Sequence, residues 1–126
     1  MTEISFVLRN EVVRFDPDRI GALEVELGAE ATEDVLFEAT ERLVDRLIDL
    51  RQAYDGNDRA GVADVAHAMA QLSDKVGLVT IARVSRDVVG CAAHGDMPAY
   101  HATVARLMRI GEGCVTGAFD FTDQYV

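Results

Sequence analysis

From residue 16 onward, apolar residues recur at intervals of three and four, and short breaker sequences interrupt this helical period. The breakers are Asp16-Pro17, Gly28, Asp55-Gly56-Asn57-Asp58, Gly77, His94-Gly95-Asp96 and the glycines at 111, 113 and 117. The segments between them predict helices over residues 17–27, 32–54, 58–76, 78–92 and from 96 onward. Four amphipathic helices with short connections predict an all-α fold, an antiparallel up-and-down four-helix bundle. The helix over 17–27 would be a short N-terminal lid.

Capping residues indicate where these helices begin. Asp16 precedes Pro17, and proline suits the first helical position because its missing N–H has no partner there. Thr32 and Asp58 are expected to cap the second and third helices with their side-chain oxygens.

The domain organisation follows from these elements. Residues 1–14 form an N-terminal arm, in which residues 4–8 and 11–15 are either two short strands about Arg9-Asn10 or an extended segment. The bundle is expected over residues 15–118, and residues 119–126 are expected to form a C-terminal tail. The three late glycines weaken the far end of the last helix.

Composition limits the class of function. The chain has 126 residues, 22 acids against 12 bases and a net charge of −10, which argues against nucleic-acid binding. No apolar run approaches the roughly 20 residues that span a bilayer, and the first residues lack the pattern of a secretory signal. Cys91 and Cys114 form neither a disulfide framework nor a metal motif. We therefore expect a soluble, cytoplasmic domain without a nucleic-acid or membrane partner.

His67 is the most informative polar residue. The inward residues of its helix would be Val62, Val65, Ala66, Met69, Leu72 and Val76. At 100° per residue, His67 falls about 160° from their centre, on the outer face. Its neighbours on that face are Ala60, Ala63, Ala70, Gln71 and Asp74. Small side chains leave the ring accessible, so this pattern predicts a docking face for a partner; the alternative is a solvated histidine without a role.

An imidazole suits phosphoryl transfer because one ring nitrogen is nucleophilic near neutral pH. Asp64 and Gln71 lie one turn before and one turn after His67, within reach of its other ring nitrogen. His94 falls in a turn and His101 at an edge of the bundle, and neither has the neighbours of a metal site.

The sequence Ala66-His67-Ala68-Met69-Ala70-Gln71-Leu72-Ser73 to Gly77-Leu78 resembles the signature of histidine-containing phosphotransfer (HPt) domains. Their pattern is Ala-His-x-Leu-Lys-Gly-x-Ser/Ala, followed by Gly-Leu or Gly-Ala at the next helix. The segments 15–20, 26–28, 55–58 and 94–96 are also similar to the family's opening and turns, so the resemblance covers roughly residues 15–116.

The resemblance implies a phosphoprotein of a two-component phosphorelay. His67 would carry a phosphoryl group between receiver-domain aspartates, and the chain would be a carrier rather than a stand-alone catalyst. It would have no cofactor of its own, because the receiver supplies Mg²⁺. The implied partners are receiver domains of response regulators, with a hybrid histidine kinase as a further candidate.

Two positions depart from the family's pattern. Ala70 replaces the lysine that helps to hold the phosphoryl oxygens, and Gln71 replaces the following glycine. Arg83 and Arg86 of the next helix are candidates to replace that charge, whereas Asp74 would repel a phosphate.

These departures keep two alternatives open. The first is an HPt-like binding module that docks on a receiver or kinase and regulates it without phosphotransfer. The second is a bundle that self-associates through its apolar arm over residues 4–15.

Overall fold

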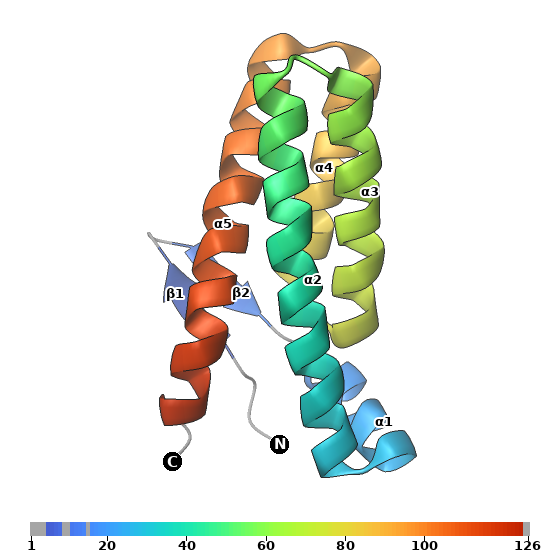
Figure 1. Ribbon diagram of the computed structural model, residues 1–126, viewed down its shortest axis with the longest axis vertical. Coiled ribbons are helices and arrows are strands. Elements are labelled where there is room, and N and C mark those ends of the chain that lie inside the picture. The colour runs from blue at the N-terminus through green and yellow to red at the C-terminus, as the bar shows by residue number, and fades with distance from the viewer. Residues whose placement is uncertain (1–4, 9–10, 15, 125–126) are drawn as a thin grey trace.

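The computed structural model describes the backbone of residues 5–8, 11–14 and 16–124, and the side chains of residues 16–113. This part of the chain contains a two-stranded hairpin and five helices (Figure 1). The elements are β1 (Ser5–Leu8), β2 (Glu11–Arg14), α1 (Pro17–Leu27), α2 (Ala29–Asp55), α3 (Arg59–Val76), α4 (Val79–His94) and α5 (Met97–Gln124).

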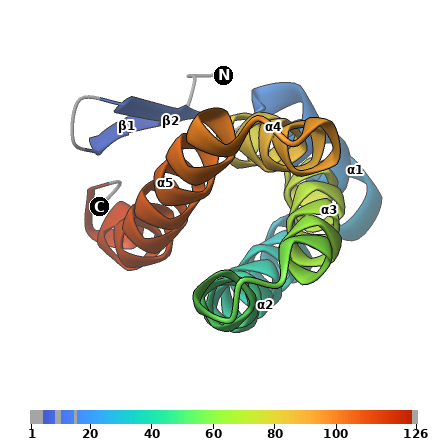
Figure 2. The same cartoon turned by 90° about the horizontal axis from the view of Figure 1, so that it is seen from above.

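Helices α2 to α5 form a helical bundle. Seen from above, they follow a curved path in chain order (Figure 2). Each packs against the next, and α2 also contacts α5. Their inward side chains form one apolar core, whose largest fully buried members are Leu43, Leu50, Met69, Ile81, Leu107 and Ile110.

Residues 5–8 and 11–14 of the N-terminal arm form two short strands, the first of the two alternatives expected from the sequence. Strands β1 and β2 are antiparallel, with Ser5 opposite Arg14 and Leu8 opposite Glu11. The hairpin contacts α4 and α5, so it lies against the side of the bundle (Figure 2). Contact with helices gives a two-stranded sheet the support that it lacks alone in water.

Two of the predicted caps are confirmed and one is wrong. Asp16 accepts a hydrogen bond from the backbone N–H of Asp18 at 3.0 Å, and Asp58 accepts one from that of Gly61 at 2.9 Å. Helix α2 begins at Ala29, so Thr32 lies inside it and donates its hydroxyl to the Gly28 carbonyl at 2.8 Å.

Gly28 is the physical reason for this earlier start. Its φ of 86° lies in the region that favours glycine. The chain can therefore turn at this one residue, and α2 begins without an intervening loop.

Helix α5 does not stop near its glycines, and it continues to Gln124. Residues 119–124 are therefore helical, not a separate tail. Gly111 is buried where α5 approaches α2, since a Cβ atom at this position would lie 2.7 Å from Cδ2 of Leu47. The glycine serves close helix packing here rather than helix termination.

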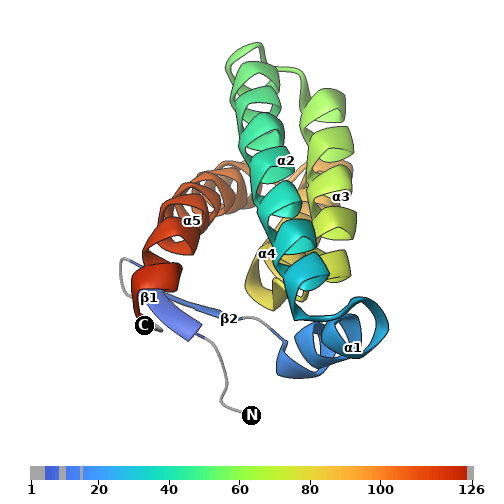
Figure 3. The same ribbon diagram turned by 60° about the horizontal axis from the view of Figure 1, so that its bottom comes forward.

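Helix α1 lies across one end of the bundle (Figure 3). The backbone N–H of Asp16 donates to the Gly77 carbonyl at 2.7 Å, and Arg19 Nε donates to the Lys75 carbonyl at 3.0 Å. These bonds attach α1 to the turn between α3 and α4. Among the described residues, no helix is both long and apolar enough to cross a membrane.

Candidate functional site

His67 lies on the outer face of α3 and is exposed. The preceding Ala66 and the following Met69 are fully buried, because they belong to the apolar face of the same helix. The predicted exposure of the imidazole is therefore correct. The ring is presented by a rigid element, well inside the helix and away from its ends.

The exposed surface around His67 contains fewer residues than the sequence predicts. Ala60, Gln71 and Asp74 are exposed and Ala63 is half-buried, but Ala70 keeps only 4% of its surface exposed. The expectation that Ala70 belongs to an exposed docking face is wrong. Helix α3 packs against both α2 and α4, so its buried arc is wider than the apolar stripe alone indicates.

Neither residue expected to hold the His67 ring contacts it through a hydrogen bond. Asp64 and Gln71 are both exposed, and within the described side chains no hydrogen bond joins them to His67. The ring is therefore not oriented by a neighbour on its own helix.

An ion pair lies further along the same face of α3 as the histidine. Arg86 of α4 donates a hydrogen bond from Nη2 to Oδ2 of Asp74, two helical turns from His67. The two side chains are 56% and 53% exposed, so solvent screens the pair. Arg83 is exposed and forms no ion pair with the described residues. Of the two candidate arginines, Arg86 thus compensates the acid that would repel a phosphate.

A second histidine is held by a partner on another helix. At the far end of the bundle, His101 Nδ1 and the Tyr54 hydroxyl form a hydrogen bond of 2.6 Å that joins α5 to α2. The His101 ring also meets the rings of Tyr54 and Tyr100 edge-on, at 5.6 and 5.3 Å. Burial, with a smaller contribution from Tyr54, raises the pKa of the Tyr100 hydroxyl above its usual value of 10.0.

His101 lies at an edge of the bundle, as the sequence predicts. Its hydrogen bond to Tyr54 does not follow from the sequence. The two residues are 47 positions apart, and no local pattern relates them.

The described residues offer no metal site near His67, and the groove on the surface lies elsewhere. No group of three or more His, Cys, Asp or Glu side chains among the described residues could hold a metal ion. A groove of about 320 Å³ lies between α1, α2 and α3, and it does not include His67. Its lining includes the cations of Arg19, Arg42 and Lys75 and the carboxylates of Glu26 and Glu38.

No protein-family model and no curated protein matches the sequence. Among solved structures, the chain is similar to the crystal structure of histidine-containing phosphotransfer protein B (HptB) from Pseudomonas aeruginosa PAO1, with a TM-score of 0.75 and 19% sequence identity. The similarity covers 89% of this chain and 96% of that protein. The chain therefore has an HPt-like fold.

Proposed function

We propose that this protein is a phosphorelay intermediate that carries a phosphoryl group on His67 between receiver-domain aspartates. The observation that carries the proposal is an exposed imidazole on α3 of an HPt-like fold. The proposal includes the finer architecture expected from the sequence, in which α2 to α5 form an antiparallel four-helix bundle and α1 covers one end.

The proposed reaction needs only the imidazole from this chain. A nitrogen of His67 bonds to phosphorus as the bond to the aspartyl oxygen breaks, and the aspartate leaves as a carboxylate. A second receiver takes the group by the reverse exchange. Mg²⁺ and the reacting aspartate belong to the receiver, so this chain has no cofactor in the proposal.

The charges near His67 are compatible with an anionic group. Asp74 carries a negative charge on this face, and Arg86 compensates it. Gln71 is exposed one turn from His67, and its amide can donate a hydrogen bond to a phosphoryl oxygen. The lysine of the family's pattern would give a stronger, charged donor.

The test is intact-mass analysis after incubation with phosphoramidate, a small phosphoryl donor. We expect one acid-labile adduct on the wild-type protein and none on His67→Ala. His94→Ala is the matched control, because His94 is also an exposed histidine but lies at the end of α4, away from the proposed site. Transfer is then tested with isolated receiver domains and Mg²⁺. Labelling that survives in His67→Ala but not in His94→Ala would reject the site.

A second candidate function is a binding module without phosphotransfer. It is favoured by the alanine at position 70, by the glutamine at 71 and by the lack of a described hydrogen bond to the His67 ring. His67→Gln separates the two functions. A binding module would keep both its receiver binding and its cellular effect in this variant, whereas a relay would keep the binding and lose the effect.

A further inference from the structure

Three large apolar side chains of α2 are exposed to solvent. Phe37, Val44 and Ile48 keep 54%, 37% and 52% of their surface exposed. They follow one another at intervals of seven and four residues, so they lie on one line along the helix. We call these three residues the α2 stripe.

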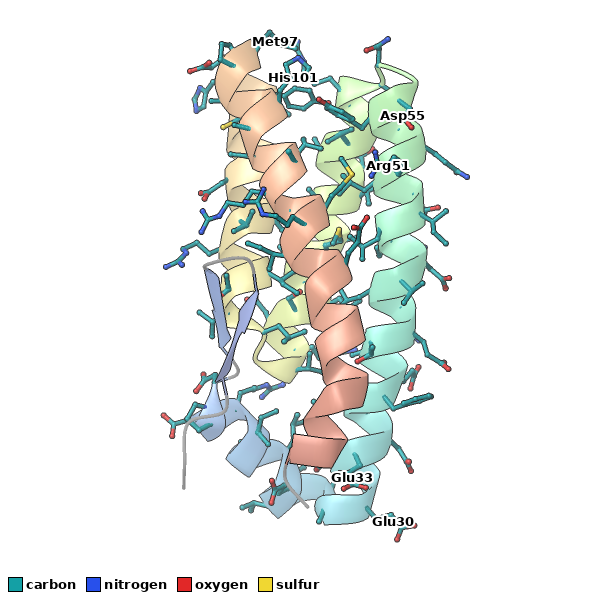
Figure 4. All side chains as sticks on the ribbon, turned by 90° about the vertical axis from the view of Figure 1, so that its left-hand side faces the viewer. Glu30, Glu33, Arg51, Asp55, Met97 and His101 are labelled. Carbon is teal, nitrogen blue, oxygen red and sulfur yellow. The ribbon has the colours of Figure 1, made fainter. Side chains whose placement is uncertain are left out.

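The α2 stripe borders the contact between α2 and α5. Leu47, beside Ile48, is half-buried and lies against Gly111 of α5. Arg51, one turn further along α2, pairs with Glu112 of α5 at 3.9 Å. The stripe therefore lies on the side of α2 that faces α5, the side from which Arg51, labelled in Figure 4, pairs with α5.

His67 lies on a different side of the bundle. The outer face of α3 that carries His67 is joined to α4 through Asp74 and Arg86. Figure 2 shows α3 and α5 on two different sides of α2, and the α2 stripe lies on the α5 side, away from the face that α3 shares with α4. The stripe is thus a second surface.

The charges beside the α2 stripe are negative. Each of the three arginines of α2 already forms an ion pair with an acid. Arg42 pairs with Glu38 at 2.9 Å, Arg46 with Asp49 at 3.1 Å and Arg51 with Glu112. The remaining acids have no ion-pair partner among the described residues. They are Glu30, Glu33, Asp34, Glu41, Asp45 and Asp55, and Figure 4 shows Glu30 and Glu33 toward one end of α2 and Asp55 toward the other.

We propose that the α2 stripe docks a basic amphipathic helix of a partner protein. Apolar side chains of that helix would cover Val44 and Ile48, and its flanking Lys or Arg side chains would pair with Glu41 and Asp45. An acidic border around an apolar line complements such a helix in both polarity and charge.

A second copy of this chain fits the stripe less well. It would bring the same unpaired acids of α2 against each other, and each copy carries a net charge of −10. Like charges brought together disfavour an interface.

The probe is a synthetic peptide of about 18 residues, built from Leu and Lys with leucines at helical spacing. A scrambled peptide of equal composition and a Leu/Glu peptide of the same pattern are its controls. Binding is measured by fluorescence anisotropy at low and moderate salt. We expect the Leu/Lys helix to bind about tenfold or more tightly than either control.

Variants then locate the binding. The double variant Val44→Gln/Ile48→Gln should weaken binding about tenfold or more, and Val79→Gln, an exposed apolar residue at the start of α4, should leave it unchanged. Glu41→Gln/Asp45→Asn should weaken binding and flatten its salt dependence more than Glu24→Gln/Glu26→Gln on α1. His67→Ala should bind as wild type, so failure of the relay function would not affect this test.

Three results would overturn the proposal. The first is unchanged affinity of the Val44→Gln/Ile48→Gln variant. The second is equal affinity for the scrambled peptide, which would indicate attraction by charge alone. The third is a dimer in sedimentation velocity that this double variant dissociates, because the occupant would then be a second copy.

Discussion

Arg86 on α4 and Asp74 on α3 form a hydrogen-bonded ion pair on the same face as His67. The pair links the two helices that flank this surface, and it offsets the negative charge that Asp74 would otherwise present. Both side chains are about half exposed, so we expect the pair to contribute only about 0–1 kcal/mol to the free energy of unfolding. We expect its larger effect to be on the approach of an anion to His67.

We predict that Arg86→Ala slows phosphoramidate labelling of His67 about two- to fivefold. The variant leaves the negative charge of Asp74 without its partner, about one Debye length from the imidazole. Because salt screens charges at this distance, the slowing should be larger at low salt. Arg83→Ala is the control for net charge and should label as wild type. Asp74→Asn combined with Arg86→Ala should restore the rate, and a slow double variant would show that the uncompensated carboxylate is not the cause.

We predict opposite results for a lysine at positions 70 and 71. Gln71 is exposed one turn from His67, so Gln71→Lys should speed labelling and change the free energy of unfolding by less than about 0.5 kcal/mol. Ala70 is buried against the bundle, so Ala70→Lys should lower that free energy by about 1–3 kcal/mol.

Urea denaturation and intact-mass labelling measure both effects. If Ala70→Lys were as stable as the wild type, its long side chain would have to reach solvent past the neighbouring helices without disturbing the packing. The burial of Ala70 would then place no constraint on the charge at this position.

Gly111 and Gly90 form a matched pair of helix-interior glycines. A Cβ atom at Gly111 would lie 2.7 Å from Leu47, whereas one at Gly90 would meet nothing within 4 Å. We predict that Gly90→Ala raises the free energy of unfolding by about 0.5–1 kcal/mol, through helix propensity alone. Gly111→Ala should lower it by about 1 kcal/mol, because Leu47 must move. Equal shifts in urea denaturation would contradict a close contact between α2 and α5.

The sequence predicted those parts of the fold that depend on neighbouring residues. Asp16 and Asp58 cap their helices as expected, since each cap is a bond to a residue two or three positions away. The wrong cap at Thr32 arose because Gly28 can turn the chain at once, and the angles that it adopts are not visible in the sequence.

The candidate site was predicted only in part. The exposure of His67 follows from the apolar period of α3, but the burial of Ala70 depends on how α2 and α4 pack against α3, which the pattern of one helix does not show. The hydrogen bond between Tyr54 and His101 joins α2 to α5. Predicting it requires knowledge of how these two helices pack. The chemistry of His67 stays a prediction until labelling is measured.

The last prediction concerns alkaline pH. Burial raises the pKa of Tyr100 in the folded protein above its usual value of 10.0, so the unfolded chain ionises first. This contribution to stability is fully present below pH 10 and is lost as the pH rises through the folded pKa. We therefore expect the free energy of unfolding to fall above about pH 10 in the wild type, and to fall less in Tyr100→Phe. Tyr54→Phe should change the pH dependence less than Tyr100→Phe does, because it keeps the Tyr100 side chain and its burial and removes only the smaller contribution of Tyr54 to the raised pKa. Urea denaturation at pH 8 to 11 measures the dependence, and an identical pH slope in Tyr100→Phe and wild type would assign the loss to other groups.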